Sequence, residues 1–320
     1  MATADQLKTL IKSHFDNEVE RFNTVSLQIA AHEAQLGHIN IADEIRKLVE
    51  KSKLNIPRLK HFSNDFQGLI LESKTDNRFN DLVVSDQLKA RIERILNEDR
   101  QKVKLKKHGL DSRRKILLAG APGTGKTMTA SIIAHELGLP LYTILMDKMV
   151  TKFMGETSAK LRQVFEFIQE RKGVYLFDEF DAIGGERGKD NDVGEMRRVL
   201  NSFLQFIERD HSDSIIVAAT NNIRLLDSAL FRRFDDVLQY NLPTKAEMVR
   251  LMENKLGKFK GDYSLPTIVK PISKLSHAEV SQASIDAIKA TILADKDKVE
   301  RSLLIKMLND RTETHNRKRK

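Results

Sequence analysis

The sequence predicts an α/β fold in which a parallel sheet carries helices on both faces, with a small helical domain before it and a helical lid after it. Three observations lead to this fold class. Short β-type runs alternate with helical stretches between residues 115 and 240, a pattern typical of parallel sheets. A glycine-rich loop joins the first run to a helix. Residues 1–52 and 242–310 instead carry apolar positions at helical spacing.

The first segment is expected to be a small helical domain. Apolar positions within Leu7–Ile29 predict one amphipathic helix of about 25 residues, and those within Ile41–Val49 a shorter helix after a break at Gly37. Such a domain either serves packing alone or docks partners and substrates, and the sequence leaves both open. The irregular stretch after it contains Pro57 and is expected to form a linker with one short strand over 68–71.

Five β-type runs make up the predicted sheet. Residues 79–107 begin with an apolar turn and continue as a charged helix, and Met128–Leu137 is a helix closed by Gly138. After Pro243 the chain is helical to about Asn309. The predicted strands are residues 115–119, 141–144, 174–177, 214–219 and 236–240. The predicted segments are therefore a helical domain at 1–52, a linker at 53–78, a large α/β subdomain at 79–241, a lid at 242–310 and a basic tail at 311–320.

Composition narrows the class of protein. No apolar run approaches the roughly 18–20 residues of a membrane span, and the first residues lack the order of a secretory signal. The absence of cysteine excludes disulfides and thiolate metal sites, so we expect a cytoplasmic protein without a membrane segment. The net charge is +9, but the basic residues are scattered apart from Arg317–Lys320, and a charge run at a chain end is usually solvated.

The glycine-rich loop Gly120–Thr127 matches the pattern G-x-x-x-x-G-K-[ST]. Glycines allow several backbone N–H groups to point at one anion, and the start of the following helix favours negative charge. Lys126 is therefore expected to reach the β- and γ-phosphates of a nucleotide, and Thr127 to hold Mg²⁺. The alternative is a glycine-rich turn with a chance lysine, which the flanking strand and helix disfavour.

Two further runs end in polar residues. In Val174–Glu179, Asp178 is expected to orient Mg²⁺ or its water, and Glu179 to accept a proton from the attacking water. The run over 215–220 leads to Asn221, which could hydrogen-bond that water or the γ-phosphate. Polar turns after buried strands are the alternative reading of both runs.

In this order the motifs resemble those of the AAA family of ATPases, over about Phe79–Ile292. The resemblance implies the fold of P-loop nucleotide hydrolases and the use of ATP with Mg²⁺. The segments that carry it, besides the phosphate loop, are Phe79–Val84, Asp178–Ile183, Arg197–Asn201, Ala218–Asn222, Leu226–Leu230 and Arg233–Asp235.

The resemblance also implies site residues. Asn221 matches the family's first sensor, and Arg232 and Arg233 stand where arginine fingers act on ATP in the neighbouring subunit. The family spaces these arginines three apart, so Arg232 is alternatively an ordinary surface ion pair. In Leu275–Val280, His277 stands where glycine is frequent. The nucleotide pocket is expected to comprise Val83, Ala121, Pro122, Gly123, Thr124, Gly125, Lys126, Thr127, Met128 and Ala278.

The segment Lys152–Glu156 resembles the pore loop of AAA unfoldases, in which Lys152, Phe153 and Met154 would contact a polypeptide. The alternative is that its apolar residues are core residues of an amphipathic turn. Gly184–Asp192 suits a second pore loop or a plain exposed connection.

The resemblance implies a homohexameric ring that hydrolyses ATP to thread or remodel protein substrates. The sequence has no His-Glu-x-x-His motif, so any proteolysis would need a separate protease or effector as partner. One alternative is a nucleic-acid remodeller such as a helicase or replication loader. The +9 charge favours it, whereas the lack of a basic stripe interleaved with aromatics disfavours it. Another is a nucleotide-controlled assembly switch that binds a partner without translocation.

Overall fold

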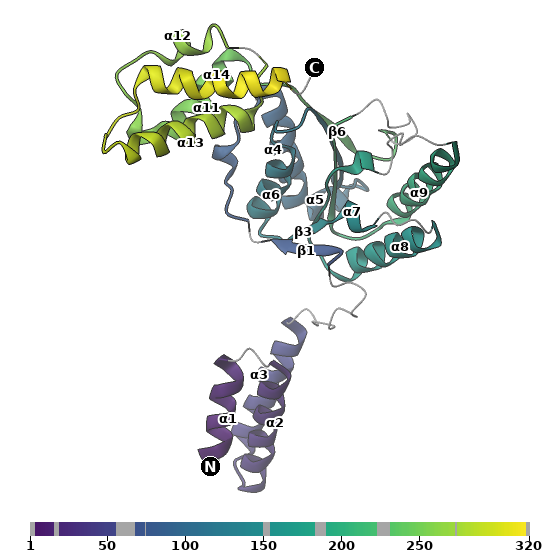
Figure 1. Cartoon of the computed structure of the whole chain (residues 1–320). Helices are drawn as coiled ribbons and strands as arrows, with labels where there is room; N and C mark the ends of the chain where they lie inside the picture. The colour runs from purple at the N-terminus through teal and green to yellow at the C-terminus, as the bar shows by residue number, and fades with distance from the viewer. Residues whose placement is uncertain are drawn as a thin grey trace. The chain divides into compact units, whose positions relative to one another are not determined.

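The computed structural model describes residues 4–15, 19–55, 68–73, 75–149, 154–182, 190–222, 231–272 and 274–317. The chain forms two compact units, Met1–Gln67 and Gly68–Lys320 (Figure 1). Among the helices in the described ranges, none is long and apolar enough to pass through a bilayer.

The N-terminal unit contains three helices, α1 (Ala4–Phe15), α2 (Val19–Gln35) and α3 (Ile39–Asn55). The predicted single helix over 7–29 is therefore wrong, because α1 and α2 are separate helices that pack against each other. Apolar spacing cannot reveal this division, because apolar residues recur at helical spacing in the sequence of both helices. The break at Gly37 is confirmed, and its φ of 86° lies in the left-handed region.

The second unit is built on a six-stranded sheet with the order β1-β3-β4-β5-β2-β6. Every pair of neighbouring strands is parallel except β1 and β3. The five predicted strands are confirmed, and the strand expected near residues 68–71 lies at Ile70–Ser73, where it adds an antiparallel edge. The strands are β1 (Ile70–Ser73), β2 (Lys115–Gly120), β3 (Leu141–Ile144), β4 (Val174–Phe177), β5 (Ile215–Thr220) and β6 (Asp236–Tyr240).

Helices cover both faces of this sheet, as β4 illustrates. Val174 and Leu176 belong to a core shared with α4 and α6, whereas the alternate residue Phe177 packs against Phe165 and Phe203 of α8 and α9. Figure 1 shows α4 and α6 on one side and α8 and α9 on the other. The helices of this region are α4 (Asp86–Arg100), α5 (Lys102–Lys107), α6 (Lys126–Leu137), α7 (Met146–Met149), α8 (Met154–Glu170) and α9 (Asp190–Arg209), with 3₁₀ turns η2 (Phe79–Asp81) and η3 (Phe180–Ala182). The predicted α/β fold class is confirmed.

The lid that follows β6 has a hydrophobic core of its own. Capping boxes at Thr244 and Ser276 begin its first and third helices. Its last helix extends to Arg317, into the segment expected to be a tail. The lid consists of α11 (Lys245–Leu256), η5 (Gly257–Phe259), α12 (Leu265–Val269), α13 (His277–Leu293) and α14 (Arg301–Arg317).

One short segment joins the two cores. Leu82 and Val84 are buried in the core of the sheet, whereas Val83 between them is buried in the core of the lid. Because successive side chains of an extended segment point in opposite directions, three residues suffice to link both parts.

Candidate functional site

The phosphate loop connects β2 to α6, as the sequence predicts. At Gly120 the backbone passes so close to β6 that a Cβ atom would lie 2.1 Å from the Tyr240 carbonyl oxygen. Gly125 caps α6 with a φ of 102°. Gly120 is therefore required by the close approach of two backbone segments, and Gly125 by its left-handed conformation. Together they bring the loop over the start of α6.

Lys126 is the first residue of α6 and is only 6% exposed. Its ammonium group donates hydrogen bonds to the carbonyl oxygens of Gly120 (2.8 Å) and Ala121 (3.0 Å) and to Oδ1 of Asn221 (2.9 Å). Burial lowers the pKa of Lys126, and the carboxylates of Asp178 and Asp181 oppose this shift. Phosphate oxygens are acceptors of the same kind with more charge, so they can take the place of these carbonyl groups.

Thr127 and Asp178 are brought together from different elements. The Thr127 hydroxyl donates to Oδ2 of Asp178 at 2.8 Å. A hydroxyl and a carboxylate oxygen fit Mg²⁺, which usually binds one or two protein ligands together with water and phosphate oxygens. The described residues contain no cluster of three or more His, Cys, Asp or Glu that could hold a metal ion.

Glu179 follows Asp178 at the end of β4 and is exposed. Its φ is 52°, a left-handed conformation that is costly for a non-glycine residue, and its backbone N–H donates to Oδ1 of Asp178 at 2.9 Å. This turn orients the two carboxylates differently: one faces Thr127, and the other is left exposed at the cavity.

Asn221 lies at the end of β5, beside Lys126. Its backbone N–H donates to Oδ1 of Asp181 at 3.1 Å. Asp181 is thus a positioning residue that the sequence does not reveal, although it lies in the same acidic segment as Asp178 and Glu179.

These residues line one cavity of about 510 Å³, a volume that suits a nucleotide. Val83, Asp178, Glu179, Asn221 and Ala278 line it, as do residues 122–128. Ala121 does not line it, but its carbonyl group accepts from Lys126 and Thr124.

The lid contacts the phosphate loop directly. The Ala278 N–H donates to the Gly123 carbonyl oxygen at 2.9 Å. A Cβ atom at Gly123 would lie 2.8 Å from Oγ of Ser276, and φ at this glycine is 72°. The cavity is thus closed by two parts of the fold that meet at a glycine.

The predicted arginine fingers do not line this cavity. Arg232 is exposed, and Arg233 forms an ion pair through Nε with Oε1 of Glu208 on α9. Nothing in the local sequence marks Glu208 as the partner of an arginine 25 residues later.

The pore-loop prediction falls mostly outside the described residues. Lys152 and Phe153 are outside the described ranges, whereas Met154 is the first residue of α8. Of the proposed second pore loop, residues 184–189 also lie outside the description, whereas 190–192 begin α9.

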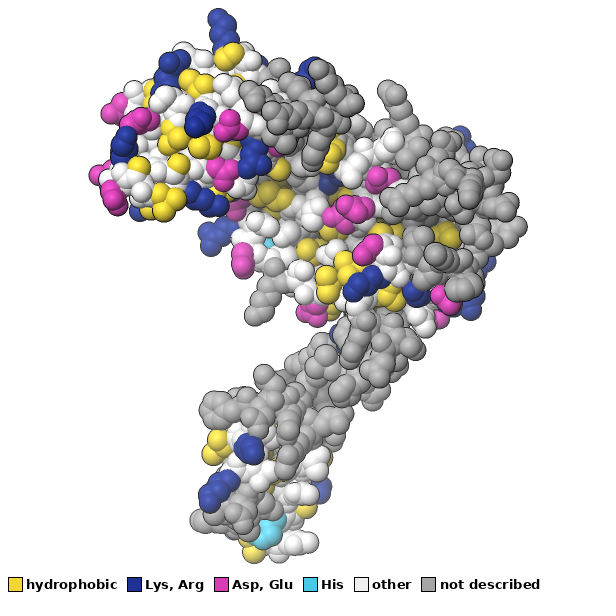
Figure 2. Space-filling view, in the orientation of Figure 1, with side chains coloured by type: hydrophobic (Ala, Val, Ile, Leu, Met, Phe, Trp, Pro, Cys, Tyr) yellow, Lys and Arg dark blue, Asp and Glu magenta, His cyan; other side chains and the backbone are white. Residues whose placement is uncertain are grey.

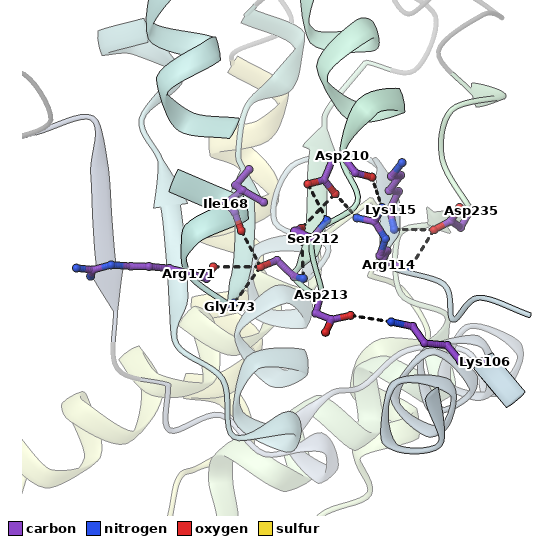
Figure 3. A network of polar contacts seen from close by, with 11 residues as sticks. Lys106, Arg114, Lys115, Ile168, Arg171, Gly173, Asp210, Ser212, Asp213 and Asp235 are labelled. Carbon is purple, nitrogen blue, oxygen red and sulfur yellow. Dashed lines mark hydrogen bonds and ion pairs between the residues drawn. The ribbon is translucent and has the colours of Figure 1, made fainter. Parts of the chain in front are cut away.

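A second polar cluster lies at the opposite, amino end of the sheet (Figure 3). Asp210, which is fully buried, accepts from the Arg114 guanidinium and from the Ser212 hydroxyl. Asp235 accepts from the backbone N–H groups of Arg114 (2.8 Å) and Lys115 (2.9 Å). The carboxylates therefore anchor the start of β2, the strand whose other end carries the phosphate loop.

Comparison with known proteins agrees with this site. Residues 116–242 match the family described as ATPase family associated with various cellular activities (AAA). An uncharacterised AAA family ATPase, y4kL, of Sinorhizobium fredii is 31% identical over 317 residues, which cover 97% of this chain and 96% of the relative.

Other relatives are similar over part of this chain and are longer proteins. The proteasome-activating nucleotidase of Saccharolobus solfataricus is 30% identical over 212 residues, or 63% of this chain and 53% of that protein. The ATP-dependent zinc metalloprotease FtsH of Slackia heliotrinireducens is 31% identical over 239 residues, or 71% of this chain and 30% of that protein. The matching chain thus spans about half of the first relative and less than a third of the second. The full-length similarity and the geometry of the nucleotide cavity together show that the chain belongs to the AAA family of ATPases and hydrolyses ATP.

Proposed function

We propose that the chain assembles into a homohexameric ring and uses ATP hydrolysis to thread or remodel protein substrates. One observation carries the ring: the described residues that line the cavity include no arginine, whereas Arg232 and Arg233 lie outside it. Phosphoryl transfer is accelerated by a guanidinium that stabilises the developing charge. A second copy of the chain can supply Arg233 from the neighbouring position, and such head-to-tail contacts close into rings.

Within one subunit the residues have separate roles in this proposal. Lys126 binds the β- and γ-phosphates, and Asn221 orients the attacking water. Glu179 accepts the proton of that water. Thr127 and Asp178 would hold Mg²⁺, which would supply positive charge to the phosphate oxygens.

Movement of the lid gives ATP hydrolysis a mechanical consequence in this proposal. The cavity lies between the phosphate loop and the lid, which meet at Gly123 and Ala278. A nucleotide that binds there contacts both the phosphate loop and the lid. Its hydrolysis removes some of these contacts and so changes which arrangement of the lid and the loop is the more stable.

Two observations support a polypeptide substrate. The segment Lys152–Glu156 has the basic, aromatic and aliphatic residues of a peptide-gripping loop. Two relatives have names that refer to proteolysis: one is a proteasome-activating nucleotidase, and the other is an ATP-dependent zinc metalloprotease. The present sequence lacks the His-Glu-x-x-His pattern, so we propose that a separate protein would perform any cleavage.

Surface charge gives the nucleic-acid alternative less support. On the face of the lid shown in Figure 2, basic and acidic side chains are interspersed. Charged side chains of the lid also form ion pairs, such as Lys296 with Glu300 and Arg311 with Asp286. A nucleic-acid surface is instead expected to carry one sign of charge along its length.

The test uses Glu179→Gln, which is expected to bind ATP without hydrolysing it. With ATP present, we would measure the oligomer mass and identify material that co-purifies from cell extract. A hexamer carrying polypeptide supports the proposal, a hexamer carrying nucleic acid favours the alternative, and a monomer with bound ATP contradicts the ring. The control is Lys126→Ala combined with Glu179→Gln, which should bind neither ATP nor substrate.

The trans action of Arg233 has its own test. Arg233→Ala and Lys126→Ala are each expected to be inactive alone. Mixing them places an intact loop beside an intact arginine at some interfaces, so part of the ATPase activity should return. No recovery in mixed oligomers of verified composition would contradict action in trans.

A further inference from the structure

His277 is a buried side chain whose polar atoms have no protein partner. It is the first residue of α13, is 8% exposed and lines the nucleotide cavity. Neither Nδ1 nor Nε2 makes a hydrogen bond. Buried polar groups are almost always paired, so an unpaired imidazole beside a ligand cavity points to a bond that the ligand completes.

The surroundings determine the state of this ring. Burial lowers the pKa of His277, while the Glu247 carboxylate and the Val83 backbone oppose the shift, so the ring is neutral near pH 7. A neutral imidazole has one N–H donor and one acceptor nitrogen. The Val83 backbone raises the pKa, which is the effect of a nearby carbonyl group, so the tautomer with N–H on that side is favoured although the pair does not reach hydrogen-bond geometry. The other nitrogen is then an acceptor.

The cavity itself orders the parts of a nucleotide. Lys126 marks its phosphate end, whereas His277 belongs to the lid end together with the apolar Leu251 and Ile285, which suit a flat base. Gln282 also lines this end, but its amide already donates to Asp286 at 2.9 Å.

We infer that His277 determines the base specificity of the site by accepting a hydrogen bond from the exocyclic amino group of adenine. Guanine and hypoxanthine present a carbonyl oxygen at the same position, so an acceptor would face an acceptor. Loss of a matched bond in a buried site reduces affinity, and two facing acceptors reduce it further. The inference depends on ATP binding, and it is independent of ring formation and polypeptide threading.

The experiment measures dissociation constants by calorimetry for ATP, ITP and inorganic tripolyphosphate with Mg²⁺. The wild type is expected to bind ATP about tenfold or more tightly than ITP. His277→Phe keeps a ring in the same place without its nitrogens, so it should bring the two nucleotides within about twofold of each other. Tripolyphosphate binding should be unchanged because it reports only the phosphate end.

Two further variants guard against an indirect effect. His277→Ala tests the same loss if the larger Phe ring does not fit, and thermal unfolding checks that each variant is folded. His108→Ala removes an exposed histidine beyond α5 and should keep the wild-type preference. Retention of the preference for ATP in folded His277→Phe or His277→Ala would overturn the inference, as would equal binding of ATP and ITP by the wild type. Absence of all ATP binding in the wild type would instead contradict the ATPase assignment.

Discussion

The two ends of the parallel sheet use polar residues in opposite ways. At the amino end, the oxygens of Asp210 and Asp235 are engaged by side chains and N–H groups of the same chain (Figure 3). At the carboxyl end, Lys126 is held by carbonyl groups that a phosphate can replace, and Glu179 is exposed in a left-handed conformation. At the amino end the polar groups form their hydrogen bonds within the fold, whereas at the carboxyl end they are available to bind a ligand.

This difference explains how a strained site persists. Residues in unfavourable conformations last only when the surrounding structure over-determines them. Here Ser214 at the start of β5 bonds the carbonyl groups of Ile168 and Arg171, and the buried Tyr240 of β6 bonds Thr129 below the loop. The strands are thus fixed at their amino ends and in the core, so their carboxyl ends can carry reactive groups.

The largest expected effect is at the carboxyl end, in Glu179→Gln. Removing a general base should lower the ATPase turnover by about 10²–10⁴-fold. ATP affinity and the free energy of unfolding should change little, because the carboxylate is exposed and only its backbone N–H bonds Asp178. Steady-state turnover and nucleotide titration check this. The matched control is Glu72→Gln on the edge strand β1, and a Glu179→Gln enzyme with wild-type turnover would show that another group is the base.

The amino end should show the reverse pattern in Asp210→Ala. The substitution leaves the Arg114 guanidinium without its buried partner, so the protein should lose about 3–5 kcal/mol of stability. The folded fraction should bind ATP with unchanged affinity. The matched control is Asp213→Ala, whose pair with Lys106 is 58% exposed on both sides and should contribute about 0–1 kcal/mol. Equal destabilisation in the two variants would contradict the proposed anchor.

The sequence predicts the parts of this comparison that local patterns encode. The buried strands, the phosphate loop and the acids after β4 each appear as short runs with a fixed order, and the structure has the five strands where the runs predict them. The bond between Asn221 and Asp181 joins residues 40 apart, and Asp235 reaches Arg114 across 121 residues. No local sequence pattern predicts hydrogen-bond partners that are this far apart in the chain, because the order of strands in the sheet brings them together.

The division between α1 and α2 was missed for a related reason. Phe15, Val19 and Phe22 keep helical spacing across the end of one helix and the start of the next, so the apolar period continues through the break. The strand β1 was expected only as a short piece of linker, because its partner β3 lies about 70 residues later and makes it an edge of the sheet.

A smaller effect is expected where the lid meets the loop, in Gly123→Ala. The new methyl group would lie 2.8 Å from Oγ of Ser276, and the left-handed φ adds backbone strain of about 1–2 kcal/mol. Gly138→Ala is the matched control, because φ is 63° there and nothing lies within 4 Å of the new atom. Chemical denaturation should show a loss in both variants, whereas calorimetry should show weaker ATP binding only in Gly123→Ala. Equal ATP affinities would separate the lid contact from nucleotide binding.

The smallest expected effect is the pH dependence that His277 adds at the carboxyl end. Its pKa in the folded chain is lowered by burial from the ordinary value of 6.5, with Glu247 opposing, so the unfolded chain takes up a proton first as the pH falls. Stability contributed by the neutral ring is therefore present above pH 6.5 and lost as the pH decreases through 6.5 toward the lowered pKa. His277→Gln removes this term and leaves the other histidines in place. Urea denaturation at pH 7.5 and pH 5.5 should show a smaller loss of stability in His277→Gln than in the wild type, and equal losses would mean that the ring is not kept neutral by its surroundings.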